Sequence, residues 1–526
     1  MTLKLSAEEQ RRAASVEGES SAMRWLAIAA WLIIFALCIL KFFYLSADFP
    51  NYSPWMEDQA KFTDEGWWAG AAVTHHLIGN WNVIGDYNPT VVVPVWPILL
   101  GALFHFTGVS VVAARALSVT FCIATLGTIY FLVRRYTDSR SATPATLAVL
   151  LLSASPFAFV FCRLAILETL VIFEFCLLML IASFSSAKRI WPILTLPVLI
   201  TVMILTKTTA AALVPAIFWL AWNGMGRKPA SFLRVLLVAG AIPAALLKGY
   251  AMLVSALGYG LDYHYFFSIN ALPNVVWSHT AATILNLLHH CFWIDRILYP
   301  IGLIILVLSV SWLRKLWSNP LFAACWIALG AQACYIFRRQ DDYAPRYFLG
   351  MLAPLVLVIV LTYGNLDLHF KKPAAVLLLA TVVSAGVNIA AVAQFVAHRQ
   401  HQFQDAALSI RNIIMSDPKQ KQLILGVSGS QISLMTGIPS INDFYGTENL
   451  TGKVSRYQPG WYLVWNSMDE NNLAMLSSYQ FTETASYPVF DDDDRNKLIL
   501  YKMTRLAGDL PIQTPSGTKR ARARPE

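Results

Sequence analysis

Charged side chains are scarce in this sequence of 526 residues: Asp, Glu, Lys and Arg make up 13% of it, whereas 56% is hydrophobic. A soluble protein is about 25% charged and about 45–50% apolar. The shortage of charge therefore excludes a soluble enzyme, a disordered regulator and a fibrous chain. Several apolar runs approach the length of about 20 residues that crosses a bilayer, so we expect a polytopic α-helical membrane protein.

Cysteine and metal-binding motifs are also scarce. The seven cysteines all lie in or beside apolar segments, and no CxxC or Cys/His metal spacing occurs. This pattern excludes a disulfide framework in the polar C-terminal region. The net charge of +9 does not indicate a nucleic-acid partner, because most Lys and Arg residues form short clusters between apolar runs and therefore act as topology signals.

The spacing of the apolar runs predicts about eleven transmembrane helices, the first of which is a signal anchor. We expect them near 24–44, 109–133, 142–161, 167–184, 190–206, 208–223, 234–256, 297–313, 320–337, 348–364 and 374–396. The apolar piece at 91–107 is interrupted by Pro94, Pro97 and Gly101, and we interpret it as an interfacial or re-entrant helix. With this count the basic clusters from Arg134/Arg135 to Lys371/Lys372 face the cytoplasm, as the positive-inside rule requires.

An odd number of spans places the two ends of the chain on opposite sides of the membrane. The expected parts are a cytoplasmic segment at 1–23, a transmembrane domain at 24–396 with a large first outer loop at 45–108, an extracytoplasmic α/β domain at 397–513 and a disordered tail at 514–526. Strand-like runs at 423–427, 461–465 and 497–501 and a helix-like run at 467–479 favour the α/β assignment. The membrane is expected to be a bacterial inner membrane, with the endoplasmic reticulum as the alternative.

Under this topology carboxylates and cations gather on the outer side. They are Asp58, Asp64, Glu65, His75, His76, Arg163, Glu168, Lys207, Asp262, His264, Arg338, Arg339, Asp341, Asp342 and Arg346. A carboxylate can take a proton from an attacking hydroxyl or amine, and Lys or Arg can stabilise a departing phosphate. The residues therefore indicate group transfer from a phosphate-bearing lipid at the outer surface.

Five short motifs in this region resemble a known family. They are Thr63-Asp64-Glu65-Gly66-Trp67-Trp68, Gly108 to Leu117 (GVSVVAARAL), Arg163-Leu-Ala-Ile-Leu-Glu168, Leu205-Thr-Lys207, and Arg346-Tyr347 followed by Pro354. Their order and common sidedness resemble the GT-C glycosyltransferases, in the branch that contains protein O-mannosyltransferases and the aminoarabinose transferases of lipid A. The resemblance covers roughly 24–360 and is strongest at 60–210.

The resemblance implies an inverting membrane glycosyltransferase that takes a sugar from a polyprenyl-phosphate donor. It implies Asp64 as the general base, with Glu65 and Glu168 as further catalytic candidates, although the family usually has Asp at the second position. It also implies donor-phosphate contacts from three cations, Lys207, Arg346 and Arg163. The acceptor is a lipid, a glycan or a protein, membrane lipids surround the chain, and no nucleic acid is involved.

A divalent metal ion is one candidate cofactor, for which His264 beside Asp262 is a candidate ligand. Structural interpretations stay open for the site residues: Asp64 and Glu65 as a helix start, Lys207 as a snorkelling side chain, and Arg163 with Glu168 as a loop ion pair. Arg115 and Glu174 lie inside spans and are expected to bridge helices.

Two other functions remain as alternatives. The first is a polytopic transporter or lipid flippase, which commonly shows two repeated halves. No such repeat is visible here, and the polar groups gather on one side of the membrane. The second is an oligosaccharide ligase or polymerase, which uses similar chemistry on a larger donor.

Overall fold

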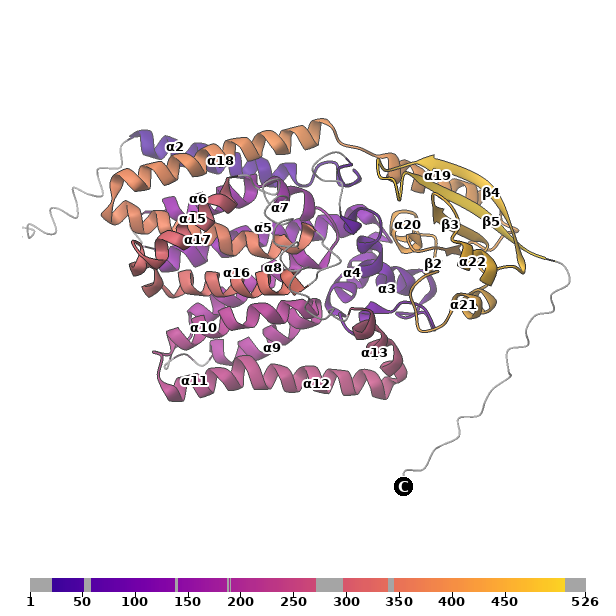
Figure 1. Ribbon diagram of the computed structural model, residues 1–526, viewed down its shortest axis with the longest axis horizontal. Coiled ribbons are helices and arrows are strands. Elements are labelled where there is room, and N and C mark those ends of the chain that lie inside the picture. Colours follow the sequence, from indigo (N-terminus) through magenta and orange to yellow (C-terminus); the bar gives the residue numbers. More distant parts are fainter. Residues whose placement is uncertain are drawn as a thin grey trace, which may run out of the picture.

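The computed structural model describes residues 21–51, 58–137, 141–186, 189, 191–270, 297–338 and 345–506. Most of the predicted cytoplasmic segment 1–23, the predicted tail 514–526, and Arg339, Asp341 and Asp342 lie outside the described residues. Within them the chain forms a helical bundle followed by a C-terminal α/β domain (Figure 1).

Each apolar run that predicted a span is helical. The helices are α2 (Ser21–Leu40), α5 (Val111–Tyr136), α6 (Thr143–Ala154), α7 (Pro156–Phe161), α8 (Leu167–Ser183), α9 (Trp191–Thr206), α10 (Val214–Gly224), α11 (Pro229–Leu236), α12 (Ile242–Val254), α15 (Leu298–Val310), α16 (Pro320–Arg338), α17 (Leu349–His369) and α18 (Lys371–Ala397). Four helical stretches of the described chain are long and apolar enough by themselves to cross a membrane, and six shorter apolar helices accompany them. The number of eleven spans stays a prediction.

One break divides a predicted span, and a second separates the predicted spans 190–206 and 208–223. The run at 142–161 divides into α6 and α7 at Pro156, where the Ser155 hydroxyl accepts a hydrogen bond from the amide of Ala158 and so caps the second helix. The chain leaves α9 at Lys207, whose backbone is extended (φ −155°, ψ 122°), and then forms the 3-10 helix η3 (Thr208–Leu213) before α10. The second break leaves a basic residue, Lys207, just outside the apolar helix α9.

The first loop contributes two helices, α3 (Asp64–Ile78) and α4 (Val95–Thr107), the second of which matches the short helix expected at 91–107. Gly79 ends α3 in the left-handed conformation with φ +79°, which a glycine adopts without steric cost. A further helix, α13 (Gly260–Ile269), continues beyond α12 into a region expected to be a loop.

The C-terminal domain has a five-stranded mixed sheet. Its elements are α19 (Gln402–Ser416), β1 (Ile424–Leu425), α20 (Gly429–Thr436), β2 (Ser440–Ile441), α21 (Leu450–Tyr457), β3 (Trp461–Trp465), α22 (Glu470–Met475), β4 (Tyr479–Pro488) and β5 (Lys497–Arg505). The strand order is β2-β1-β3-β5-β4, in which β1 is parallel to β2 and β3, and β5 is antiparallel to β3 and β4. The structure confirms the predicted α/β fold and its three predicted strand regions, while β2 and β4 were not predicted.

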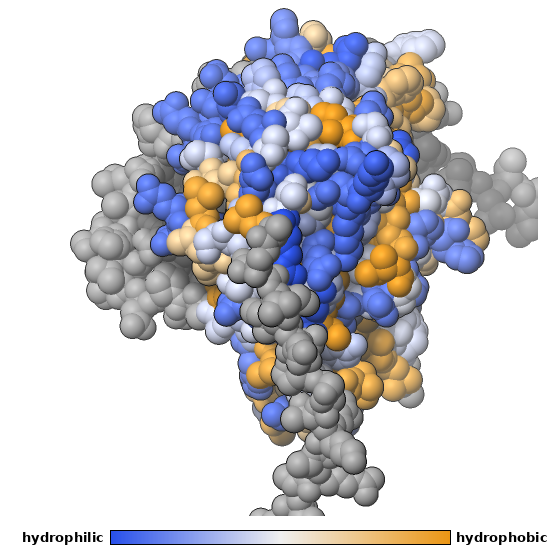
Figure 2. Space-filling view, turned by 90° about the vertical axis from the view of Figure 1, so that its right-hand side faces the viewer, coloured by the Kyte–Doolittle hydropathy of each residue, from blue (hydrophilic) through white to orange (hydrophobic). Residues whose placement is uncertain are grey.

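The molecule has an apolar body and a polar end. The largest apolar core of the described residues lies within the bundle, where α17 is buried along most of its length, whereas α2, α12 and α18 expose many large apolar side chains. Helices α3, α4 and α13 lie between the bundle and the C-terminal domain (Figure 1). We call this the domain end of the bundle. The face of the molecule at this end is largely hydrophilic in its centre (Figure 2).

Candidate active site

A buried ion cluster centred on Arg346 lies at the domain end of the bundle. Arg346 belongs to the 3-10 helix η7 (Pro345–Phe348), which leads into α17. Its guanidinium contacts the carboxylates of Asp58 at 2.5 Å, Asp64 at 2.8 Å and Glu168 at 3.6 Å. Its backbone amide also donates to Asp58 at 3.0 Å. One arginine therefore joins the first loop to the first turn of α8.

Lys207, at the end of α9, adds a second cation to the cluster. Its ammonium contacts the Glu168 carboxylate at 2.5 Å and lies 5.2 Å from the centre of the Tyr347 ring. The chain leaves helix α9 at this residue, and the side chain extends to Glu168. A lysine ammonium has three N–H donors. Lys207 also lines a cavity with Gln332 and Tyr347, so it can contact a further acceptor there.

Asp64 is the first residue of α3 and is 3% exposed. Burial raises the pKa of Asp64 to about 6 against the lowering effect of the Arg346 guanidinium, and the carboxylates of Asp58 and Glu168 add to the rise. A general base works best when its pKa is near the working pH. The position of Asp64 therefore gives this carboxylate a proton affinity suited to acid–base work.

Glu65 has a different environment from its neighbour. Its carboxylate forms two hydrogen bonds with the Arg115 guanidinium, at 2.8 and 2.6 Å, and accepts others from the Ala165 amide and the Gln431 side chain. These partners come from α5, the turn before α8 and α20. The structure thus places Glu65 as a structural link between elements, and it confirms that Arg115 bridges helices.

Arg163 and His264 lie apart from the contacts of the cluster. Arg163 donates from Nη2 to the backbone oxygens of Phe43 and Tyr44, both at 2.6 Å, and so faces the end of α2. His264 is exposed on α13, while Asp262 accepts a hydrogen bond from Asn88. The described contacts of Arg163 do not reproduce its predicted grouping with Lys207 and Arg346 as donor-phosphate contacts.

No metal site is formed by the residues that the structure describes. They contain no group of three His, Cys, Asp or Glu side chains that could hold one. Near Arg346, the three carboxylates of Asp58, Asp64 and Glu168 contact two cations, Arg346 and Lys207.

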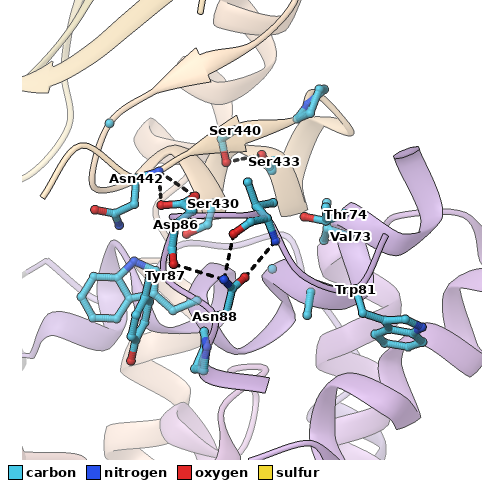
Figure 3. A pocket seen from close by; sticks show the side chains of 17 residues that line it. Val73, Thr74, Trp81, Asp86, Tyr87, Asn88, Ser430, Ser433, Ser440 and Asn442 are labelled. Carbon is cyan, nitrogen blue, oxygen red and sulfur yellow. Dashed lines mark hydrogen bonds between the residues drawn. The ribbon is translucent and has the colours of Figure 1, made fainter. Parts of the chain in front are cut away.

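A separate small cavity lies where the first loop meets the C-terminal domain (Figure 3). Several of its polar groups bond to one another: Asp86 accepts from the Asn442 amide at 3.1 Å, and the Ser433 hydroxyl donates to Ser440 at 2.8 Å. Burial raises the pKa of Asp86 to about 6, while nearby Lys453 lowers it. With about 50 Å³, the cavity has room for water molecules. The cavity is therefore part of the interface between the first loop and the C-terminal domain.

Sequence reasoning missed parts of the site. Asp58 was recognised as an outer carboxylate without a role, yet it is the second partner of Arg346. Gln332 and Tyr335 line the cavity beside Lys207, but they lie inside the apolar α16, where the hydropathy pattern conceals them. In the sequence, the polar Gln332 within the predicted span 320–337 was the one indication that this helix lines a polar cavity.

Comparison with known proteins agrees with this architecture. The fold is similar to that of ArnT from Cupriavidus metallidurans bound to undecaprenyl phosphate, with a TM-score of 0.59 and 12% identity over 91% of this chain and 98% of that chain. It is also similar to the Archaeoglobus fulgidus oligosaccharyltransferase in complex with Zn and sulfate, with a TM-score of 0.52 and 14% identity over 91% of this chain and 75% of that chain. No curated protein sequence matches the chain.

These similarities show that the chain has the fold of the GT-C glycosyltransferases. The resemblance that the motifs predicted is therefore confirmed. Within that class, residues 89–248 match the family model described as dolichyl-phosphate-mannose-protein mannosyltransferase. The roles of the individual site residues stay predictions.

Proposed function

We propose that this protein is an inverting membrane glycosyltransferase that takes a sugar from a polyprenyl-phosphate donor. The observation that carries the proposal is the single cluster formed by Asp64, Arg346, Glu168 and Lys207, which come from four separate segments of the chain. It supplies a buried carboxylate beside two cations. The undecaprenyl phosphate bound to ArnT, which has a similar fold, supports this choice of donor.

In the proposed reaction Asp64 accepts the proton of the acceptor hydroxyl or amine. The acceptor atom then forms a bond to the anomeric carbon of the sugar, while the bond from that carbon to the phosphate oxygen breaks. Lys207 stabilises the departing polyprenyl phosphate, and Arg346 holds Asp64 in place and faces the same charge. Protonation of Asp64 removes one negative charge from the cluster at the moment when the phosphate gains one.

The domain end is proposed to face the outside of the membrane. Arg135, at the end of α5, and Lys315 line a cavity together with Asp367, near the end of α17. Since Arg346 lies just before the start of α17, these basic residues lie at the opposite end of the bundle. The positive-inside rule then places them in the cytoplasm and the active site outside. The acceptor, whether lipid, glycan or protein, stays open.

The test compares Asp64→Asn with the exposed control Asp493→Asn. Mass spectrometry of glycolipids and glycans from cells that produce each form should show the product with wild type and control, and a loss of at least about 100-fold with Asp64→Asn. Purified Asp64→Asn protein should still bind undecaprenyl phosphate, whereas Lys207→Gln should bind it more weakly. Wild-type turnover by Asp64→Asn would remove this residue from the role of base.

The same protein in detergent solution distinguishes transfer from transport. A glycosyltransferase forms its covalent product without two compartments, whereas a flippase has no measurable activity there. Transfer of whole oligosaccharides instead of single sugars would favour the ligase alternative, and the mass of the product separates these two cases.

A further inference from the structure

Six Lys and Arg side chains are buried in the described part of the chain, and they fall into two groups. Four of them contact a carboxylate: Lys61, Arg115, Arg346 and Lys453. The other two, Lys41 and Arg163, contact no carboxylate among the described residues, although they are only 0% and 6% exposed. An unpaired charge is costly to bury, so these two cations call for an anion.

The two cations share one neighbour. The Lys41 ammonium lies 4.7 Å from the centre of the Phe159 ring, and the Arg163 guanidinium carbon lies 5.1 Å from the same point. Lys41 Nζ and Arg163 Nε are both buried without a hydrogen-bond partner. A cation over an aromatic ring regains only part of the hydration that it loses on burial. Free donors therefore remain on both side chains.

Cys38 and Phe42, which are close to Lys41 in the sequence, line an apolar groove between α2 and α5. It has a volume of about 470 Å³ and is lined almost entirely by carbon atoms, from Trp31, Phe35, Cys38 and Phe42 on the side of α2 and from Ile123 and Tyr130 on α5. Lys41 follows Cys38 by three residues at the end of α2, and Arg163 bonds to the backbone just beyond it. The groove therefore starts at the level where the two cations lie.

We propose that Lys41 and Arg163 bind the phosphate of an anionic glycerophospholipid whose acyl chain lies in the groove between α2 and α5. The groove side chains Trp31, Phe35 and Phe42 are exposed, so a lipid reaches the site by lateral diffusion. The flexible stem of Lys41 can swing its ammonium toward the headgroup region. This site does not depend on the proposed function, because its cations are not those of the Asp64 cluster.

The test uses the full-length protein purified in detergent and native mass spectrometry of the lipid that it retains. The probes are dioleoyl phosphatidylglycerol and the zwitterionic dioleoyl phosphatidylcholine. Wild type should retain the anionic lipid at least about fivefold better. The double variant Lys41→Gln/Arg163→Gln should lose this preference, and Lys497→Gln, an exposed lysine of the C-terminal domain, should keep it.

A second variant tests the groove by itself. Gly127 lines the groove, and a Cβ there meets no atom within 4 Å, so Gly127→Leu places a larger side chain at the groove wall. It should reduce retention of the anionic lipid while both cations remain. If the double variant does not fold, Lys41→Met serves instead: phosphatidylglycerol should raise the Tm of wild type and leave that of Lys41→Met unchanged.

Three outcomes would overturn the site. They are equal retention of both lipids by wild type, unchanged retention by the double variant, and preferential displacement of phosphatidylglycerol by undecaprenyl phosphate. The last would identify the groove as a prenyl-phosphate site.

Discussion

The residue that matters most to the proposed chemistry is Asp64, because its burial sets the pH at which it can act as a base. Its pKa lies at about 6, above the ordinary value of an aspartate, so the carboxylate keeps its proton to a higher pH than an exposed one would. A base must be ionised to accept a proton. The proposed reaction is therefore active above this pKa and inactive below it.

We expect kcat/KM of the wild type to be constant above about pH 7 and to fall about tenfold for each unit of pH below about 6. The measurement is a pH profile of sugar transfer, with a protein stability curve over the same range to exclude unfolding. A profile that stays level down to about pH 4.5 would show that no group with the pKa of Asp64 takes part.

At the scale of elements, helix α8 holds the end of α9 at two points. Glu168 contacts Lys207, and Glu174, six residues further along α8, accepts a hydrogen bond from the Thr206 hydroxyl at 2.9 Å. Thr206 and Lys207 are consecutive residues at the break between α9 and η3. The second contact confirms that Glu174 bridges helices, and it fixes the point at which Lys207 leaves its helix.

Thr206→Val keeps the shape of this side chain but removes its hydroxyl. Losing one hydrogen bond of about 0.5–1.5 kcal/mol should loosen Lys207 and raise the donor KM about two- to tenfold, with a smaller effect on kcat. Thr206→Ser retains the hydroxyl and should restore the wild-type KM. Steady-state kinetics with varied donor concentration provides the measurement, and identical KM values for Thr206→Val and wild type would disprove the positioning role.

At the scale of the whole molecule, the C-terminal domain is held against the first loop by close backbone contact. The Gly66 amide donates to Gln431 at 2.7 Å, and a Cβ on Gly66 would lie 2.2 Å from the Gln431 backbone nitrogen. Asp48 accepts from the amides of Phe403 and Gln404 at the start of α19. Because Asp64 and Glu65 precede Gly66 directly, the position of the domain also sets the position of the proposed base.

Gly66→Ala should therefore separate α3 from α20 and destabilise the protein by about 1–3 kcal/mol, the usual cost of overpacking. Gly70→Ala, one turn further along the same helix, is the matched control, since a Cβ there meets no atom within 4 Å. A lower Tm and faster proteolytic release of the C-terminal domain are expected for Gly66→Ala alone. Equal behaviour of the two variants would show that the contact is not close in solution.

The sequence by itself determined the helices of the bundle and much of the C-terminal sheet. Apolar runs must become helices in a bilayer, because every backbone polar group has to be satisfied within its own segment. The strand at 461–465 was equally readable from its aromatic and branched residues, and it matches β3. Strand β2, with two residues, and the partly exposed β4 carried too little apolar pattern to be recognised.

Only the tertiary structure decided which polar residues meet. The sequence nominated Asp64, Lys207 and Arg346 together with Glu65 and Arg163, since all belong to one predicted side of the membrane. Packing brought the first three into one cluster and turned the other two toward different partners. Hydropathy fixes the depth and side of a residue, whereas contact between residues distant in sequence depends on how helices pack and rotate, which no local pattern records.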